Sequence, residues 1–215
     1  IIGILSERLL IRFFYGRMVD TLIATWGLSL LLIGIVTAIF GNYITGVSAP
    51  MGNFSIGIYH LSTYRLVLIG LTVLLFIGIY IVFTRTRLGL IARGTMQNAQ
   101  QASVLGISTP RVYMVTFGIG AALTGLAGGL LAPISQIIPT VGFTYVAQAF
   151  ITVITGGTGA ITGTIVASGV FGTVRQLVTY QTTPIIGGVV LLIIAVLVLR
   201  LLPQGITGKI FRRSL

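Results

Sequence analysis

Four long apolar runs, almost free of charged side chains, divide the sequence. They cover residues 21–40, 66–83, 112–131 and 185–202, and each ends at turn-forming or charged residues. The apolar core of a bilayer takes about 20 residues of helix to cross. Each run therefore predicts a membrane-spanning helix.

Residues 132–184 carry a more broken pattern. The apolar stretch 143–155 makes only about 20 Å of helix at 1.5 Å per residue, less than the roughly 30 Å of a bilayer core. A second short piece, 158–174, follows Gly156 and Gly157. The two pieces fit either two spans or a re-entrant pair of broken helices, and in both cases the chain leaves on the side where it entered.

The polar stretch 84–111 is too long for a simple turn and predicts a surface helix from Leu90 to Leu105. Gly106 would end this helix, and Pro110 would prevent its continuation. An interfacial helix that rests on lipid head groups explains the same pattern. The apolar side chains would face the membrane and the polar ones water: Leu90, Ile91 and Met96 on the first side, and Arg93, Gln97, Gln100 and Gln101 on the second.

Two further stretches lie outside the predicted spans. Residues 41–64 are rich in Gly, Asn, Ser, Pro and Tyr and predict a long loop without basic residues. The chain opens with IIGIL, lacks an initiating Met, and reaches Glu7 and Arg8 at once. We expect it to begin inside a helix and to be truncated at the amino terminus, because the basic flank of a signal peptide precedes its apolar core.

Composition supports a membrane environment. Hydrophobic residues make up 55% of the 215 residues and charged residues only 7%, with a mean hydropathy of +1.09. A soluble domain of this size carries roughly a quarter charged residues to cover its surface. Pattern and composition together predict an all-α, polytopic helical membrane protein with broken or short helices in 132–175.

The basic residues report orientation. There are 13 Lys and Arg against two Asp and Glu, a net charge of +11. If residues 7–20 face the cytoplasm, the positive-inside rule places 84–111 and 203–215 there as well, and only Arg65 and Arg175 fall clearly outside. This distribution argues against a nucleic-acid partner and predicts contact with anionic lipid head groups. Ten cations fall on the predicted cytoplasmic side, with Arg200 near its boundary: Arg8, Arg12, Arg17, Arg85, Arg87, Arg93, Arg111, Lys209, Arg212 and Arg213.

Catalytic chemistry lacks its usual groups. Proton-transfer and hydrolytic reactions need at least two titratable groups held together. Apart from basic residues and tyrosines, the chain offers only Glu7, Asp20 and His60, scattered over its first third, and it has no cysteine. We therefore expect neither an enzyme nor a metal or cofactor held by this chain.

Glycines offer two interpretations. The chain has 29, too many for loops alone, and the GxxxG pairs 125–129 and 159–163 are typical of helices that pack closely in lipid. The glycine-rich segment 156–163 also interrupts the helical pattern, and irregular backbone at membrane depth is tolerated where it is buried in protein or lines a cavity. Such a break also marks a substrate path, in which half-helix ends face a polar solute.

Polar side chains inside the apolar segments are few and neutral, so a proton relay or an ion-coupled pump lacks the groups it needs. A neutral, hydrogen-bonding solute suits this set. Taken singly, each residue is also explained by packing between helices. The candidate path residues are Trp26, Tyr145, Gln148, Thr152, Gly156, Gly157 and Gly159.

Five segments carry a family pattern: FYGRMVDTLIATWGLSLLL at 14–32, TRLGLIARGTMQNAQQASVLGI at 86–107, FGIGAALTGLAGGLLAPI at 117–134, PTVGFTYVAQAFITVITGGTGAITGT at 139–164 and LLPQGITG at 201–208. With them the chain resembles the membrane permease subunits of ATP-binding-cassette (ABC) importers for branched-chain amino acids and related solutes, most closely the urea permeases. The resemblance covers essentially the whole chain. It implies one transmembrane permease domain over 1–215, similar to the carboxyl-terminal two-thirds of such a permease.

The resemblance also implies partners. These are a second, related permease subunit, two cytoplasmic ATPases that bind ATP and Mg²⁺, and a soluble substrate-binding protein outside. Closure of the ATPases would rock the permease pair between outward-open and inward-open states. In that family the loop that corresponds to 84–111 holds the coupling helix that seats in the ATPase, and the matching residues are Arg93, Met96, Gln97, Asn98, Ala102 and Gly106.

The solute is the least specific part of the resemblance. Gln148 stands where urea permeases commonly carry an Asp, Gly94 where Ala is usual, and Ala99 where a basic residue is common. A zwitterionic amino acid would want compensating charges along its path, so the neutral lining favours urea or a short amide, with branched-chain amino acids as the alternative. A self-contained urea-type channel and a purely structural membrane subunit are the competing classes.

Overall fold

The computed structural model divides the protein into two compact units, Ile1–Thr140 and Val141–Leu215, called unit 1 and unit 2 below. The residues that it describes are 2–14, 16–42, 46, 52–56, 59–135, 137–157 and 161–201.

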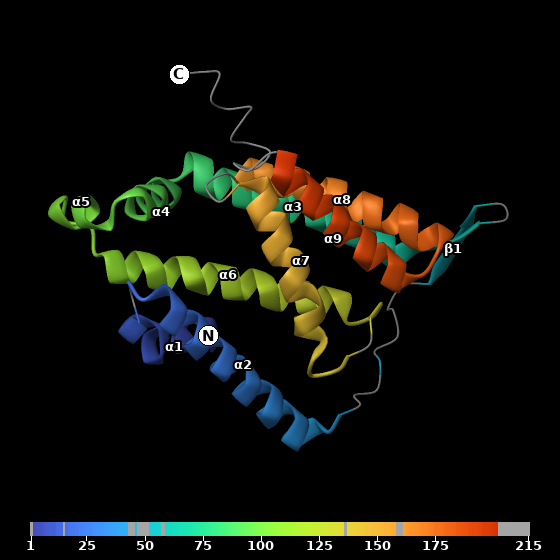
Figure 1. The fold of residues 1–215 in the computed structure, drawn as a ribbon, viewed down its shortest axis with the longest axis horizontal. Coiled ribbons are helices and arrows are strands. Elements are labelled where there is room, and N and C mark those ends of the chain that lie inside the picture. The colour runs from blue at the N-terminus through green and yellow to red at the C-terminus, as the bar shows by residue number, and fades with distance from the viewer. Residues whose placement is uncertain are drawn as a thin grey trace. The chain divides into compact units, whose positions relative to one another are not determined.

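Helices make up most of both units (Figure 1). Unit 1 contains α1 (Ile2–Leu9), a short 3-10 helix η1 (Ile11–Phe14), α2 (Met18–Phe40), β1 (Asn53–Ile56), β2 (Tyr59–Ser62), α3 (Thr63–Arg85), α4 (Arg87–Gln97), α5 (Ala99–Val104) and α6 (Thr109–Leu131). Unit 2 contains α7 (Val141–Gly156), α8 (Ile161–Gln181) and α9 (Pro184–Leu201). This architecture confirms the predicted all-α polytopic class.

Three helices are long and apolar enough to cross a membrane: Val19–Phe40 within α2, and the whole of α3 and α6. They confirm three of the predicted spans. The helices begin at Met18, Thr63 and Thr109, three residues before the predicted starts at 21, 66 and 112. The early turns hold charged residues such as Asp20, Arg65 and Arg111, which suit a helix end at the level of the head groups. Helix α9, at 18 residues, is shorter and matches the fourth predicted span.

Residues 132–184 form two separate helices around Gly157. Helix α7 has 16 residues, about 24 Å, and α8 has 21 residues, about 32 Å at 1.5 Å per residue. The prediction that the second piece ends at 174 is wrong, because the helix continues to Gln181. Arg175 therefore lies inside α8 and not in an external loop. Whether the pair spans the bilayer twice or re-enters it stays open.

The predicted loop 41–64 contains an antiparallel hairpin, in which Asn53 pairs with Ser62 and Ile56 with Tyr59. Strand β2 leads directly into α3. The prediction of a non-helical segment is confirmed for these residues, while the pairing of the strands was not foreseen.

Close contacts at small residues hold α1 on α6 in unit 1. A Cβ on Gly3 would clash with Ala121, and one on Gly118 would lie 2.9 Å from Ile4. Helices α3 and α6 are joined by the Tyr64 hydroxyl, which donates to the Leu130 carbonyl oxygen at 2.8 Å. This bond satisfies a carbonyl in the last turn of α6, which has no partner within its own helix.

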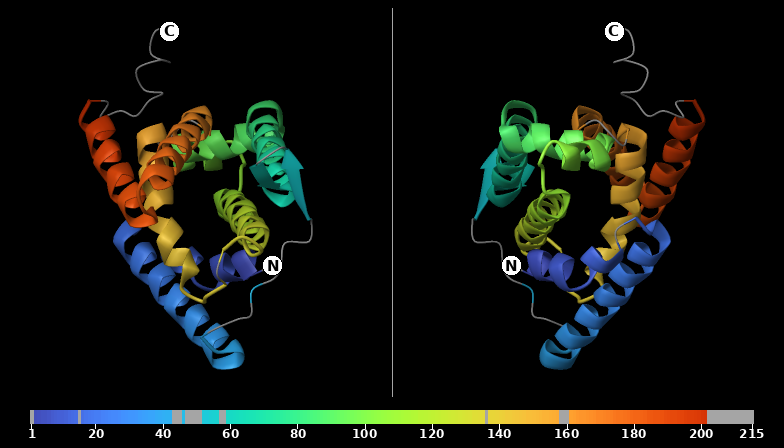
Figure 2. Two further views of the ribbon diagram at one scale, coloured as in Figure 1. Left: turned by 90° about the vertical axis from the view of Figure 1, so that its right-hand side faces the viewer. Right: turned by 90° about the vertical axis from the view of Figure 1, so that its left-hand side faces the viewer.

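Unit 2 packs around Phe171, Leu191 and Ala195, with Ile151 and Ile194 against them. Its three helices contact one another pairwise and lie side by side (Figure 2). A Cβ on Gly156 would lie 2.6 Å from the Thr164 backbone, and one on Gly187 would clash with Thr179. These glycines allow α8 to approach both of its neighbours closely.

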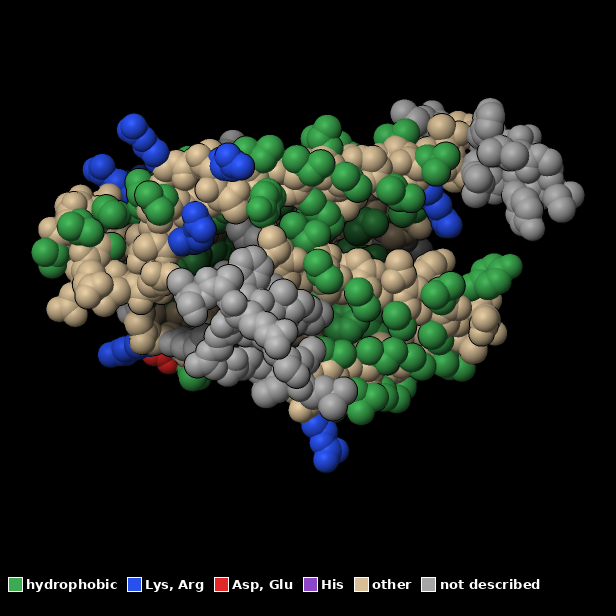
Figure 3. Space-filling model, turned by 90° about the horizontal axis from the view of Figure 1, so that it is seen from above, with side chains coloured by type: hydrophobic (Ala, Val, Ile, Leu, Met, Phe, Trp, Pro, Cys, Tyr) green, Lys and Arg blue, Asp and Glu red, His purple; other side chains and the backbone are tan. Residues whose placement is uncertain are grey.

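The long helices carry their apolar side chains on the outside. No residue in the apolar windows of α2, α3 and α6 is buried within the described chain. Hydrophobic side chains cover much of the face shown in Figure 3. Lipid is as apolar as leucine, so such exposure is expected of a protein whose solvent is the bilayer. A Cβ added to Gly125 or Gly129 would meet no described atom within 4 Å, so close packing at that GxxxG pair stays a prediction.

Candidate functional site

The α3–α4 corner sets the direction of the predicted coupling segment. Thr86 adopts an extended conformation between the two helices, and its hydroxyl oxygen accepts a hydrogen bond from the Gly89 N–H at 3.4 Å. Gly89 lies against the backbone of Phe83, where a Cβ would clash. The chain can therefore leave α3 and enter α4 within a single residue.

The predicted helix from Leu90 to Leu105 is two helices, and its prediction as one is wrong. Asn98 is extended, and its side-chain oxygen accepts from the Gln101 N–H at 3.0 Å, which caps α5. Asparagine competes with the helical backbone in this way and therefore favours helix starts.

The far end of α5 confirms the role predicted for Gly106. Gly106 has φ +82°, its N–H donates to Ser103 at 3.0 Å, and the Ile107 N–H donates to Ala102 at 3.1 Å. This is a Schellman ending, which requires a left-handed residue and hence favours glycine. The helix pair α4–α5 is thus closed at both ends by local hydrogen bonds.

Small residues form the packed face of α4–α5. Gly89, Ala92, Thr95 and Ala102 are buried in unit 1. Leu90 and Met96, which were predicted to face the membrane, are exposed. Whether lipid covers them stays a prediction.

One of the six predicted coupling residues is buried and the other five are exposed. Ala102 is buried at 5% exposure, so it supports α5 and is not available to a partner. Sequence reasoning missed Val104 and Leu105, which are 83% and 79% exposed beside Gly106. Their signal was two apolar residues immediately before a helix-ending glycine. The remaining predicted residues are exposed: Arg93, Met96, Gln97, Asn98 and Gly106.

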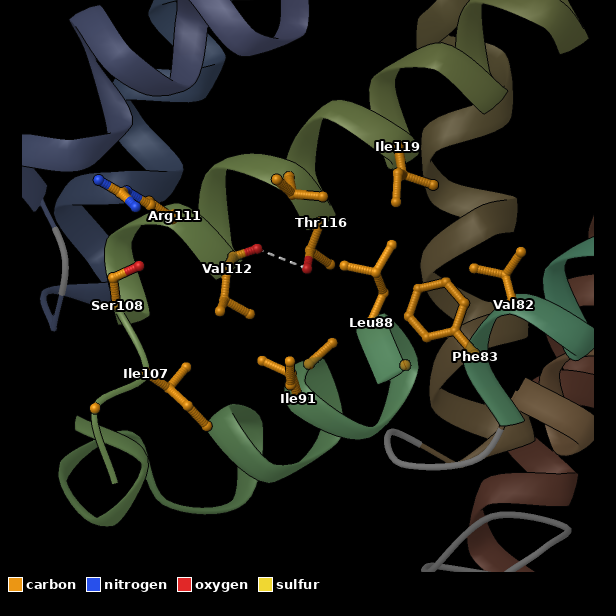
Figure 4. Close-up of a pocket in the computed structure, with 14 residues that line it drawn as sticks. Val82, Phe83, Leu88, Ile91, Ile107, Ser108, Arg111, Val112, Thr116 and Ile119 are labelled. Atoms are coloured by element: carbon orange, nitrogen blue, oxygen red, sulfur yellow. Dashed lines mark hydrogen bonds between the residues drawn. The ribbon is translucent and has the colours of Figure 1, made fainter. Parts of the chain in front are cut away.

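A cavity of about 360 Å³ lies beneath α4, between α3 and α6. Leu88 and Ile91 reach into it from α4, Phe83 from α3, and Val112 from α6 (Figure 4). The Thr116 hydroxyl on its wall donates to the Val112 carbonyl oxygen at 2.8 Å and so is satisfied within its own helix. The lining is almost entirely apolar, so the cavity suits apolar contacts with α4 better than it suits a polar solute.

The predicted path residues of α7 share one helical face. Tyr145, Gln148 and Thr152 are spaced by three and four residues, the spacing of neighbours on a helix surface. Tyr145 is exposed, and the other two are partly buried. The Thr152 hydroxyl donates to the Gln148 carbonyl oxygen at 2.7 Å. The face therefore presents a phenol and an amide to its surroundings.

The glycine residues at the α7–α8 connection have structural roles. Gly156 is buried against the Thr164 backbone. Gly157 has φ +98° and ends α7, with its N–H donating to Val153 at 3.1 Å. Gly159 lies outside the described residues. These contacts support the packing interpretation for Gly156, and a path role for this segment stays a prediction.

Trp26 is the one predicted path residue that belongs to unit 1. It lies on α2 in unit 1 and is exposed. Glu7, also in unit 1, lies in α1 and is only 3% exposed, and its predicted place on the cytoplasmic side stays a prediction. With Tyr113 and Thr124 it lines a cavity of about 720 Å³ against α6.

Arg175 is the polar residue that the sequence analysis placed wrongly. Its Nη1 donates to Oε1 of Gln148 at 2.7 Å, which joins α8 to α7. The expectation that only neutral polar groups occur inside the apolar segments is therefore wrong for α8. An arginine in a largely apolar helix was itself the signal, but the helix was predicted to end one residue before it.

Within the part of the chain that the structure describes, no group of three or more His, Cys, Asp and Glu side chains could hold a metal ion. Long apolar helices, a capped helix pair between two of them and a side-chain hydrogen bond between α7 and α8 are the features of a polytopic helical membrane protein.

Comparison with known proteins identifies the family. Residues 1–199 match the model of the branched-chain amino acid transport system permease component, and the chain belongs to this family. It is therefore an integral, multi-pass protein of the inner membrane. No solved structure matches the chain.

Three curated relatives have names that agree with the family. The "Probable branched-chain amino acid transport permease protein LivH" of Methanocaldococcus jannaschii is 28% identical, over 87% of this chain and 63% of its own length. LivH of Salmonella typhimurium, a high-affinity branched-chain amino acid transport system permease protein, is 33% identical over 79% of this chain and 53% of its own. BraD of Pseudomonas aeruginosa, of the same description, is 28% identical over 81% and 55%.

The chain thus spans between about half and two thirds of the length of these relatives. All three are named as transport permeases, which confirms the prediction that the chain is not an enzyme.

Proposed function

We propose that this chain is part of the permease subunit of an ATP-driven ABC importer that carries branched-chain amino acids into the cytoplasm. The names of its relatives support this solute, and none of these three proteins is named for urea. Branched-chain amino acids, the alternative solute given above, therefore replace urea as the proposed solute.

The observation that carries the proposal is the α4–α5 helix pair. Val104 and Leu105 lie side by side at the end of α5 at about four-fifths exposure, and we assign them to the surface that a partner covers. Arg93 and Arg87 add positive charge on the same pair of helices. This combination suits a partner groove that is apolar at its centre and polar at its rim.

The proposed partners follow from the family. Two cytoplasmic ATPases would bind α4–α5, a second related permease subunit would complete the pathway, and a soluble protein would deliver the solute from outside. ATP and Mg²⁺ would be bound by the ATPases. In this scheme residues 84–111 and 203–215 face the cytoplasm, the latter lying beyond the described residues, and 1–215 forms one permease domain.

In the proposed mechanism the helix pair α4–α5 moves as a rigid unit. Its two caps and its buried face on α6 would transmit the closure of the ATPases to α3 and α6. The permease pair would then alternate between outward-open and inward-open states, so that the solute enters from outside and leaves inside.

The test uses the complete transporter in proteoliposomes, with the full-length subunit, its ATPases and the loaded binding protein. Replacing both Val104 and Leu105 by Ala removes the apolar centre of the contact, and we expect leucine uptake to fall about tenfold or more. The matched control is Leu74→Ala, an exposed leucine in the middle of α3, which should leave uptake unchanged.

Two results would contradict the proposal. Uptake by the subunit without ATPases or ATP would indicate a self-contained channel. Uptake of urea but not of leucine by the complete transporter would restore the first expectation for the solute.

A further inference from the structure

Arg175 lies deep within a largely apolar helix. It is six residues before the end of α8 and fourteen after its start, which corresponds to about 9 Å and about 21 Å along the helix axis. An ionised side chain in an apolar helix is retained where it faces a protein interior or a water-filled path and binds a partner, or where it lies near a helix end and its stem reaches the interface.

No acidic side chain in the sequence of unit 2 is available to pair with this guanidinium. The chain contains only two acidic residues, Glu7 and Asp20, and both belong to unit 1. The side chain that Arg175 contacts, Gln148, is a neutral amide. Arg175 therefore contacts a neutral partner on the polar face of α7.

The contact leaves hydrogen-bond donors for a further group. A guanidinium has five N–H donors, and among the described residues only one of them, on Nη1, donates to a protein oxygen. The Gln148 amide accepts this bond through Oε1, so its NH₂ group still carries two donors. Two donor groups from two helices thus lie side by side, one of them charged.

Packing fixes the position of this pair. Gly187 of α9 lies against α8 at the same level, where a Cβ would be 3.3 Å from the Arg175 carbonyl oxygen. The Gln148 end is fixed by α7, which packs closely on α8 through Gly156. The backbone positions that carry the pair are therefore set by helix packing, which lowers the entropic cost of binding an anion.

We propose that Arg175 and Gln148 form the recognition point for the carboxylate of the transported amino acid. This inference rests on the proposed function and names the chemical group that its pathway recognises. Arginine suits this role because its planar donors match the two oxygens of a carboxylate. Within this proposal, Arg175 would supply the positive charge that compensates the carboxylate of a zwitterion, which the neutral candidate residues alone did not offer.

The decisive variant is Gln148→Glu. It places a carboxylate of the protein against Arg175 and leaves the helix contact intact. If the pair serves only to join α7 and α8, this change preserves or strengthens the joint. If the pair recognises the solute, the new carboxylate occupies its site.

The experiment uses the complete transporter in proteoliposomes with saturating leucine-loaded binding protein. For Gln148→Glu and Arg175→Gln we expect leucine uptake to fall about tenfold or more, in line with a lost hydrogen bond to a charged group. ATP hydrolysis stimulated by the loaded binding protein should stay within about twofold of the native rate, so that fewer leucines are carried per ATP. Arg175→Lys should retain an intermediate rate, and Arg65→Gln is the matched control for loss of an exposed arginine.

The outcomes separate the two hypotheses. Native uptake of leucine with unchanged uptake by Gln148→Glu would overturn this inference and leave the proposed function standing. Absence of native leucine uptake would overturn both. A parallel loss of uptake, ATP hydrolysis and thermal stability in Gln148→Glu would show a structural joint and overturn the inference.

A lipid phosphate offers the same anionic oxygens as a carboxylate. Vesicles of phosphatidylcholine with and without phosphatidylglycerol distinguish these sources. A defect of Arg175→Gln that is equal in both supports the solute carboxylate. A defect that occurs only with phosphatidylglycerol would assign the guanidinium to lipid and overturn the inference.

Discussion

The closest approach of α7 and α8 offers a sharp test of the packing in unit 2. A Cβ on Gly156 would lie 2.6 Å from both Cα and N of Thr164 and 2.8 Å from the carbonyl carbon of Gly163. Carbon atoms normally approach no nearer than about 3.5 Å, so Gly156→Ala must push the two backbones apart by about 1 Å. No side chain can rotate away, because the atoms that it would meet are backbone.

Overpacking of this kind costs about 1–3 kcal/mol. For a chain of this size that corresponds to a fall in Tm of about 2–12 °C. The measurement is the fraction of the purified subunit that stays monodisperse by size-exclusion chromatography after heating over a range of temperatures. Gly169→Ala is the control, since Gly169 lies in α8 with no described atom within 4 Å of the added carbon.

The reasoning would be refuted by a Gly156→Ala variant as stable as the native subunit. An equal loss of stability in Gly169→Ala would also refute the reasoning. The loss would then follow from replacing any glycine of α7 or α8 and not from the close approach at Gly156.

Three further predictions follow from unit 1 and the orientation of the chain. Because the sequence has no cysteine, a single introduced cysteine shows on which side of the membrane its position lies. Gln100→Cys should react with an impermeant maleimide only from the cytoplasmic side, and Thr182→Cys only from outside. The reverse pattern would contradict the predicted orientation. Asn98→Ala removes the cap of α5 at a cost of about 0.5–2 kcal/mol, so amide hydrogen exchange in α5 should accelerate, while Gln100→Ala should leave it unchanged. Tyr64→Phe leaves a carbonyl in the last turn of α6 without its donor and should lower stability by about 1–3 kcal/mol, whereas the partly exposed Tyr80→Phe should not.

Much of the fold could be predicted from the order of residues alone. The spans 21–40, 66–83 and 112–131 correspond to α2, α3 and α6 because twenty apolar residues in a row have only one stable arrangement in lipid, a helix that satisfies its own backbone. The local endings were readable for the same reason. Gly106 ends α5 in the predicted place because a left-handed backbone disfavours residues with a Cβ.

The errors occurred where a local pattern had competing solutions. Asn98 fits the interior of a helix in periodicity, yet its side chain captures the backbone and starts a new helix. The polar residues after 174 suggested a loop, yet α8 continues to Gln181. The Arg175 guanidinium does not depend on water there, because it donates to the side chain of Gln148, 27 positions earlier in the chain.

The sequence by itself determined that this protein lies in a membrane and which segments are long and apolar enough to cross it, because both follow from the cost of placing polar groups in lipid. Only the tertiary structure decided which polar groups meet. The contact between Arg175 and Gln148, the burial of Glu7 and the exposure of Val104 and Leu105 depend on which faces of which helices pack together. The shapes of side chains on segments far apart in the sequence decide which faces pack together. A helix that is apolar all round has little hydrophobic periodicity, so its sequence does not show which face is packed.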